Sequence, residues 1–388
     1  MSVITGIKLL IEELKSKKKF FSKDNKRNRE VVFYSESKIY YLYYEGLIKT
    51  ILEKSDLSIS YITSDPNDPV FEQQTERFKV FFINKLLAFT TPFIDSKVFI
   101  LTMPDIEQFH IKRSINDVNH IYVFHAVVSA HMMYRKGAFD HYDTIFCVGP
   151  HHIEEIRQTE KVYNLERKKE LVEVGYPWIE KVHERYENYK LSHSLNNNEK
   201  IILIAPSWHE QNIIETCGED VIKLLLEKKY QVVLRPHPEI IKRNYNRVQQ
   251  LINLFGNDKN FQMELNLTSD ENFYKADLLI TDWSGIAYEY AWGTERPVVF
   301  INTPKKVNNQ DYQELKLEPL EIKARKEIGI EVQLDDIHEI DQYVEELISN
   351  KSKYVENIVR DREKYIFNWG NASEVGADYI IDYCKNKL

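Results

Sequence analysis

The stretch ADLLITDWSGIAYEYAWGTERPVVFI, residues 276–301, decides the fold. Apolar runs bounded by polar turn residues indicate buried strands at 277–281 and 297–301, with a helix at 284–292 between them. Ser284 is a good N-cap, and Gly285 lets a ligand approach the backbone closely. The amino terminus of a helix offers unpaired N–H groups, so a phosphate can bind there without a cationic side chain. An ordinary capped turn explains the same residues equally well.

Length and composition limit the class of protein. With 388 residues, the chain is long enough for two domains of roughly 150–200 residues each. No apolar run approaches the roughly 18 residues of a membrane helix, so we expect no membrane span. A net charge of -8 argues against a nucleic-acid-binding protein. Three cysteines without metal-like spacing, in a chain that shows no signal peptide, favour the reducing cytoplasm.

The first 30 residues combine an amphipathic pattern with positive charge. Apolar residues recur at helical spacing from Ile4 to Leu14, and residues 15–29 carry eight basic side chains and one acidic one. Such a helix can rest on an anionic membrane, at roughly 1 kcal/mol per basic residue near the lipid. We therefore expect residues 1–30 to form a basic amphipathic segment. It either lies on the inner face of the plasma membrane or packs on the first domain.

Strands alternate with helices in two successive blocks, which is typical of parallel sheets covered by helices on both faces. In the first block we expect strands at 31–34, 58–63, 97–102, 120–124, 143–148 and 171–175, and helices at 40–53, 71–89 and 151–158. In the second block we expect strands at 201–205, 231–234, 261–265, 277–281 and 297–301, and helices at 215–228, 244–254, 271–275 and 284–292. Helices at 337–348, 354–369 and 373–386 complete the chain.

These blocks predict an α/β fold with two Rossmann-like, doubly wound domains. The first spans 31–175 and binds an acceptor, and the second spans 201–352 and binds a nucleotide donor. A linker at 176–200, which includes the polar run NNNE, joins them, and helices at 353–388 follow. Ligands of such folds bind at the carboxyl ends of the strands, so we expect the two domains to face a central cleft.

Three loops at the carboxyl ends of predicted strands in the second domain carry side chains suited to a phosphate ligand. In a parallel sheet these loops lie along one edge. Arg235 can fork onto phosphate oxygens, and His237, between two prolines, can donate a hydrogen bond to one. Glu289 or Glu271 can accept from a ribose hydroxyl pair. The expected donor-binding residues are Ser207, Trp208, Arg235, His237, Asp282, Ser284, Gly285 and Glu289. A rigid surface turn at residues 235–238 is the alternative.

In the first domain, His125 directly follows the predicted strand 120–124. A neutral imidazole there can remove a proton from an acceptor hydroxyl, and we expect a pKa in the ordinary range of about 6 to 7. A hydrogen-bonded structural histidine is the alternative. The loop beyond it contributes His131, Arg135 and Lys136, which we expect to contact the acceptor.

Four short motifs, lying between residues 124 and 300, occur together. They are Phe124-His125, Val174-Gly175-Tyr176-Pro177, Arg235-Pro236-His237-Pro238, and the ITDWSG run at 280–285 with its helix and Arg296-Pro297-Val298-Val299-Phe300. With them the chain resembles the CDP-glycerol glycerophosphotransferases of teichoic-acid and capsule synthesis, which have a GT-B fold. The family usually has a glycine, a basic residue and a second serine where this chain has Ala126, Trp178 and Gly285. These departures leave the exact donor open.

The resemblance implies an enzyme that moves glycerol phosphate, or a related polyol phosphate, from a CDP-activated donor to a hydroxyl of a cell-surface polymer or glycolipid. It implies that His125 is the general base, that His237 acts with Arg235, and that Ser284 with Asp282 holds the pyrophosphate. No acidic cluster has metal-ligand spacing, so we expect no protein-held metal, and Mg²⁺ loosely associated with the donor pyrophosphate stays open. Two alternatives stay open: a GT-B glycosyltransferase that uses a CMP-, CDP- or UDP-sugar in capsule or lipopolysaccharide synthesis, and a non-catalytic nucleotide-binding assembly protein.

Overall fold

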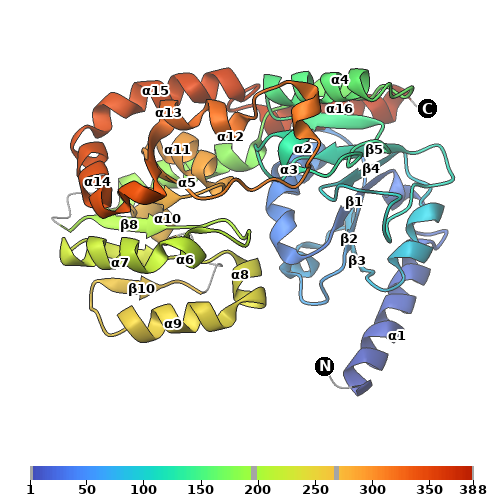
Figure 1. Cartoon of the computed structure of the whole chain (residues 1–388). Helices are drawn as coiled ribbons and strands as arrows, with labels where there is room; N and C mark the ends of the chain where they lie inside the picture. The colour runs from blue at the N-terminus through green and yellow to red at the C-terminus, as the bar shows by residue number, and fades with distance from the viewer. Residues whose placement is uncertain (1–2, 194–198, 266–270, 387–388) are drawn as a thin grey trace. The chain divides into compact units, whose positions relative to one another are not determined.

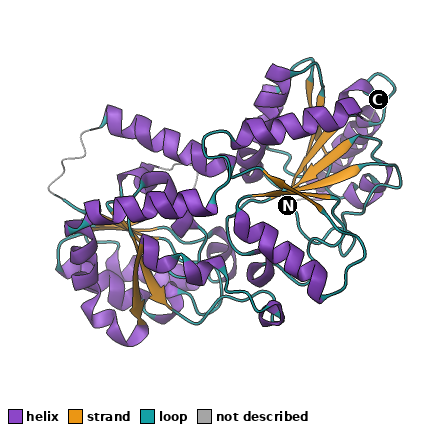
Figure 2. Cartoon of the chain, turned by 90° about the horizontal axis from the view of Figure 1, so that it is seen from above, coloured by secondary structure: helices purple, strands orange, loops and turns teal. Residues whose placement is uncertain are grey.

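Two parallel sheets, each surrounded by helices, form the frame of the protein (Figure 2). The structure is a computed structural model and describes residues 3–193, 199–265 and 271–386. The chain divides into two compact units that are each built from separate segments. Unit 1 comprises Met1–Trp178, Asn309–Leu317 and Tyr365–Leu388, and unit 2 comprises Ile179–Asn308 and Glu318–Lys364.

The sheet of unit 1 has seven strands in the order β3-β2-β1-β4-β5-β6-β7, and all neighbours are parallel. The order reverses between β1 and β4, as in a doubly wound fold. Every residue of β1 is buried, which explains why the strands appear in the sequence as apolar runs. The strands are β1 Val31–Ser35, β2 Ile59–Thr63, β3 Phe78–Phe82, β4 Val98–Leu101, β5 Asn119–Val123, β6 Thr144–Cys147 and β7 Glu170–Glu173.

Helices from both ends of the chain cover the sheet of unit 1. Helices α2 and α16 lie side by side (Figure 1). Leu47 and Ile51 of α2 and Ile380 of α16 share one core with Val31 of β1. This core explains why the last helix belongs to unit 1. The helices are α1 Val3–Phe20, α2 Tyr41–Lys54, α3 Ala130–Met133, α4 Pro150–Val162 and α16 Ala372–Asn386.

The sheet of unit 2 has six strands in the order β10-β9-β8-β11-β12-β13, again all parallel. The order reverses between β8 and β11, and ligands of such sheets bind outside the carboxyl ends of the strands at this point. The strands are β8 Ile201–Ile204, β9 Gln231–Leu234, β10 Phe261–Met263, β11 Leu278–Thr281, β12 Val298–Asn302 and β13 Gly329–Gln333.

Helices precede, connect and follow the strands of unit 2, and those that pack on the sheet bury one apolar face. Val221 of α7, Val248 of α9 and Val344 of α14 share a core with the strands. The helices are α5 Pro177–Ser192, α6 Ile213–Thr216, α7 Gly218–Glu227, α8 Pro238–Arg243, α9 Tyr245–Phe255, α10 Glu271–Lys275, α11 Ile286–Thr294, α12 Leu320–Lys323, α13 Arg325–Ile328, α14 Ile340–Ser349 and α15 Lys351–Tyr365. The alternation of strands and helices predicted from the sequence is confirmed.

One predicted helix, at 71–89, is wrong. This stretch contains the 3₁₀ turn Pro69–Gln73, the strand β3 and the 3₁₀ turn Leu87–Phe89. The run FKVFF is rich in the aromatic and β-branched residues that favour strands, and four of its five residues are buried. Apolar residues in and between the two turns recur at a spacing similar to that of an amphipathic helix, which explains the wrong prediction.

The division of the chain differs from the simple two-block prediction. Much of the expected linker at 176–200 is helix α5, while residues 196–198 of the polar run lie outside the described residues.

Gly175, just before α5, has φ +101, and a Cβ there would lie 2.3 Å from the carbonyl oxygen of Phe367. Only glycine fits that turn.

Candidate functional site

A buried carboxylate connects the loops after β8 and β11. Asp282 Oδ1 accepts hydrogen bonds from the backbone N–H groups of Ser207 and Trp283, both at 2.7 Å, and Oδ2 accepts one from Ile213 at 3.1 Å. Asp282 is 1% exposed. Three backbone donors therefore fix this side chain. We conclude that Asp282, predicted as a donor-binding residue, positions two loops of the edge.

The helix after this corner begins later than expected. Gly285 is the N-cap of α11, its φ is -62, and no side chain makes a cap hydrogen bond. The first bonds run from Ala287 N–H to the Ser284 carbonyl at 3.2 Å and from Tyr288 N–H to the Gly285 carbonyl at 3.1 Å. The prediction that Ser284 caps the helix is therefore wrong. The uncapped first turn, which also holds Glu289, keeps the N–H groups that an anion can use.

The loop after β12 is held at two consecutive carbonyls. The indole Nε1 of Trp283 donates to the carbonyl of Thr303 at 2.8 Å, and Nε2 of His209 donates to that of Pro304 at 2.9 Å. Because Nε2 carries the proton, the neutral ring accepts at Nδ1 from the hydroxyl of Ser207, at 2.6 Å. Burial lowers the pKa of His209, which favours this neutral form.

The imidazole of His237 has a defined tautomer. It caps α8, and its Nδ1 accepts from the backbone N–H of Glu239 at 3.1 Å, so the proton of the neutral ring lies on Nε2. Burial, followed by the charge of Lys306, lowers the pKa of His237 to about 4. At neutral pH this residue is therefore an uncharged hydrogen-bond donor. It lies just beyond the carboxyl end of β9, where the sequence placed it.

The ring of Trp208, in the loop after β8, lies close to residues that follow β9 and β12. Its ring centre lies 6.4 Å from that of His237, 5.0 Å from the guanidinium carbon of Arg243 and 4.6 Å from Nζ of Lys306. Arg235 is half-buried at the end of β9, where its backbone N–H donates to the Ile204 carbonyl at 2.9 Å. Sequence reasoning missed Lys306, because the loop after β12 was not counted among the strand-end loops. It also missed Arg243, because this residue lies at the end of α8 and not in a strand-end loop.

His125 lies in unit 1 directly after β5, in an aromatic cage. Its ring centre is 5.6 Å from that of Tyr40, 6.0 Å from Tyr43 and 6.3 Å from Tyr134. Nδ1 is buried and has no hydrogen-bond partner among the described residues. Burial lowers the pKa of His125 to about 4, below the ordinary range that the sequence suggested. The ring is therefore neutral at pH 7, as a base must be.

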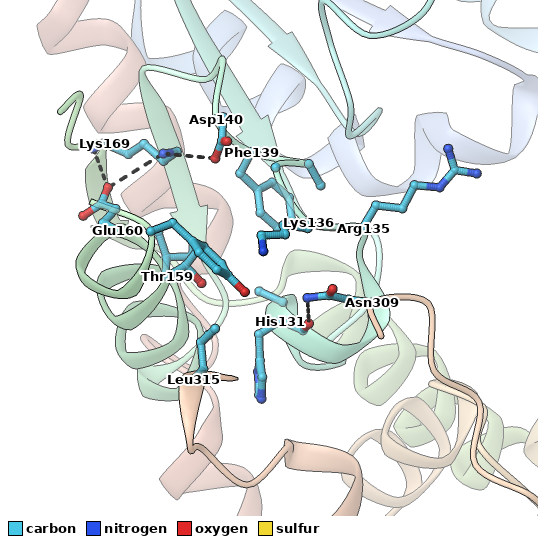
Figure 3. A pocket seen from close by; sticks show the side chains of 15 residues that line it. His131, Arg135, Lys136, Phe139, Asp140, Thr159, Glu160, Lys169, Asn309 and Leu315 are labelled. Atoms are coloured by element: carbon cyan, nitrogen blue, oxygen red, sulfur yellow. Dashed lines mark hydrogen bonds and ion pairs between the residues drawn. The ribbon is translucent and has the colours of Figure 1, made fainter. Parts of the chain in front are cut away.

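The three predicted acceptor residues line one small pocket of unit 1, of about 30 Å³ (Figure 3). This is room for little more than one water molecule. His131 is 4% exposed, and its Nδ1 lies 3.2 Å from Glu155 Oε1, so its contacts favour a structural role. Lys136 pairs with Asp311 at 3.0 Å, while Arg135 is exposed and extends away from Lys136 in Figure 3. Of the three, only Arg135 presents an exposed charge that forms no ion pair with a described carboxylate, and its guanidinium lies over the ring of Phe109.

The described residues contain neither a metal-binding cluster nor a membrane-spanning helix. No group of three or more histidine, cysteine, aspartate or glutamate side chains lies close enough to hold a metal ion. Within the same part of the chain, no helix has the length and apolar character needed to cross a membrane.

A sequence profile of the family CDP-glycerol:poly(glycerophosphate) glycerophosphotransferase matches residues 20–348. The chain belongs to this family. It is thus a glycerophosphotransferase that uses CDP-glycerol, as the four motifs suggested. No curated protein sequence matches it.

Solved structures agree on the fold. The transferase resembles the wall teichoic acid polymerase TagF with a TM-score of 0.61 at 14% identity, and the match covers 100% of both chains. It also resembles the UDP-GlcNAc 2-epimerase of Neisseria meningitidis with a TM-score of 0.60 at 13% identity, over 91% of this chain and 99% of the other. A putative UDP-N-acetylglucosamine 2-epimerase of Listeria monocytogenes gives 0.58 at 12% identity, over 89% and 93%. The transferase therefore has the GT-B fold.

Proposed function

We propose that the glycerophosphotransferase binds CDP-glycerol at the carboxyl edge of the unit 2 sheet and that His125 accepts the proton of the acceptor hydroxyl. The hydroxyl oxygen attacks the β-phosphorus of CDP-glycerol and forms a new P–O bond. The bond from that phosphorus to the bridging oxygen breaks, and CMP leaves. The uncapped first turn of α11, with the Nε2–H of His237, is the observation that supports this donor site. Fixed donors of this kind stabilise charge that develops on phosphates.

The released nucleotide tests the reaction. Incubation with CDP-glycerol and a polyglycerophosphate acceptor should release CMP, which chromatography separates from CDP. Release of a nucleoside diphosphate from a UDP- or CDP-sugar would instead support a glycosyltransferase. Nucleotide binding without turnover of either donor class would support an assembly protein. A Mg²⁺ ion associated only with the donor pyrophosphate is compatible with the proposal, and assays with and without EDTA test it.

We further propose that the acceptor is a teichoic-acid or capsule polymer, or its glycolipid precursor, at the cytoplasmic face of the membrane. Helix α1 supports this location. Its side chains Ile7, Ile11 and Leu14 are 55%, 47% and 52% exposed, and its last turn contains Lys17, Lys18 and Lys19. An apolar face next to clustered lysines suits an anionic lipid surface.

A further inference from the structure

Lys306 lies in the loop after β12, at the carboxyl edge of the unit 2 sheet, which we call the donor edge. The two carbonyl contacts described above fix residues 303 and 304, and Lys306 follows two residues later. The residues that donate to these carbonyls come from the loops after β11 and β8. The position of this lysine therefore depends on the same corner that carries the first turn of α11.

The ammonium group of Lys306 has no ion-pair partner among the described residues. It lies over the ring of Trp208, and the two carboxylates that attract it, Asp282 and Glu321, act from a longer distance. Asp282 already accepts from three backbone N–H groups. The other titratable groups that face Lys306 are His209 and His237, whose pKa values it lowers. A half-buried cation thus lies beside neutral histidines, with Arg243 at the same Trp208 ring, and no described carboxylate forms an ion pair with it.

We propose that Lys306 binds a phosphate group of the nucleotide donor, a role that rests on the function proposed above. A nucleoside diphosphate brings several negative charges. The first turn of α11 and the Nε2–H of His237 supply hydrogen bonds but no full positive charge. Lys306 and His237 both lie next to Trp208, so their donor groups can approach one anion. Lys306 supplies the charge that these neutral donors lack.

A structural role as a cation–π contact predicts a different energetic outcome. Burial lowers the pKa of Lys306 to about 8, from an ordinary value of 10.5. A lysine whose folded pKa is depressed destabilises the folded state below that pKa, and this cost disappears as the pH rises from about 8 towards 10.5. Removing the charge should therefore stabilise the unliganded protein. Removing a structural contact would destabilise it.

The test uses the full-length chain and three variants: Lys306→Met, Lys306→Arg and, as a matched control, Lys305→Met. Lys305 is the exposed neighbour in the same loop. Calorimetric titration at pH 7 with CDP should show a loss of affinity of about 10- to 100-fold for Lys306→Met. Lys306→Arg should lose less than about fivefold, and Lys305→Met should bind as the wild type does. Cytidine, which has no phosphate, should bind all four proteins equally.

Two further measurements separate binding from structure. The CDP affinity of the wild type should fall as the pH rises above about 8, because the cation is lost while the phosphates stay ionised, and Lys306→Arg should not show this fall. Without nucleotide, Lys306→Met should melt at a higher temperature than the wild type. A lower melting temperature with equal loss of CDP and cytidine binding would overturn the proposal, as would unchanged CDP affinity.

Binding of UDP to the wild type separates the role proposed for Lys306 from the assignment of CDP-glycerol as the donor. If the wild type binds UDP and not CDP, the donor assignment fails, and the same comparison of variants with UDP and uridine decides the role of Lys306. If the wild type binds neither nucleoside diphosphate, both proposals fail.

Discussion

At the scale of single residues, the donor edge contains polar groups whose partners and proton positions are already defined. The carboxylate of Asp282 accepts from three backbone N–H groups. Nε2 of His209 donates to a carbonyl and Nδ1 of His237 accepts from a backbone N–H, so both neutral rings carry their proton on Nε2. Such groups need little rearrangement when a charged ligand binds. The sequence places these residues at strand ends but does not distinguish a residue that contacts a ligand from one that holds a loop.

Substitution of His125 by alanine tests its proposed role as the general base. Because general-base catalysis contributes about 10²–10⁴ in rate, His125→Ala should lower kcat by about that factor, with CDP affinity nearly unchanged. Protonation of a base removes its activity, so kcat/KM should fall on the acid side. With a pKa lowered by burial to about 4, that fall should lie below the ordinary histidine range. Steady-state rates measured from pH 4 to pH 9 check both points.

Two other histidines of the same loop serve as controls for His125. His141 is exposed, so His141→Ala should keep wild-type kcat. His131 is buried beside Glu155, so His131→Ala should lower the melting temperature. If His125→Ala keeps most of its kcat while His131→Ala or His141→Ala loses it at normal stability, the base lies further along the loop.

At the scale of elements, the sequence predicted well those strands and helices whose side chains pack in the way their local pattern implies. Buried strands such as β1 and β11 appear as apolar runs, and α2 as an amphipathic repeat. The edge strand β13 was missed because its five residues GIEVQ are only partly buried and show no long apolar run. The N-cap of α11 was predicted one residue too early, at Ser284, because serine is usually a better N-cap than glycine. In the structure the N-cap is Gly285.

Helix α1 combines a packed side with an exposed apolar side. Glu13 accepts from the backbone N–H groups of Asn84 and Leu86, both at 2.6 Å, and Phe20 is fully buried. Deletion of the helix would therefore damage unit 1. The triple substitution Ile7→Gln, Ile11→Gln and Leu14→Gln changes only exposed positions. It should reduce co-sedimentation with anionic liposomes at least about tenfold, because burial of one such side chain in lipid contributes about 1.5–3 kcal/mol and about 1.4 kcal/mol corresponds to a factor of ten.

The matched control for α1 is Leu254→Gln on α9, whose side chain is 55% exposed in unit 2. It should sediment with liposomes as the wild type does. Both variants should keep the wild-type melting temperature. If the triple variant sediments fully, the apolar face of α1 does not mediate membrane contact, and that part of the proposal must be given up.

A buried carboxyl group between α15 and α11 gives a pH-dependent stability. Asp361 accepts from the indole Nε1 of Trp292 at 3.1 Å, and burial raises its pKa to about 7 from an ordinary 3.8. The folded state therefore holds an extra proton between about pH 4 and pH 7, and the stability contribution of this group falls as the pH rises through that window. Asp361→Asn should be more stable than the wild type at pH 8, and the difference should shrink towards pH 4.

Urea unfolding at pH 5, 6, 7 and 8 measures this effect. Within the window, one proton changes the free energy of unfolding by about 1.4 kcal/mol per pH unit at most. Glu363→Gln, at an exposed position of the same helix, is the control and should follow the wild type at every pH. A parallel pH dependence for Asp361→Asn and the wild type would show that Asp361 is ionised in the folded protein.

At the scale of the whole molecule, the sequence predicted two doubly wound sheets but not which segments complete each unit. The segment Asn309–Leu317 belongs to unit 1, where Asn309 donates from its side chain to the His131 carbonyl at 2.8 Å and from its backbone to Met132 at 3.1 Å. No local pattern in those nine residues indicates a partner about 180 positions earlier in the chain. Contacts of this kind depend on the assembled fold, which is also why Lys306 was missed.

Assignment of the nucleotide to unit 2 predicts where ligand binding slows hydrogen exchange. Saturating CDP should protect backbone amides at 206–209, 235–239, 284–287 and 303–306, because these segments surround the donor edge. A ligand at 100 times its Kd can raise the free energy of opening by up to about 2.7 kcal/mol, or about 100-fold in exchange rate. Cytidine should protect amides 284–287 much less, because the first turn of α11 is expected to bind phosphate. Peptides that contain His125 should exchange as in the free protein, and protection by CDP centred on those peptides would place the nucleotide in unit 1 and refute the donor assignment.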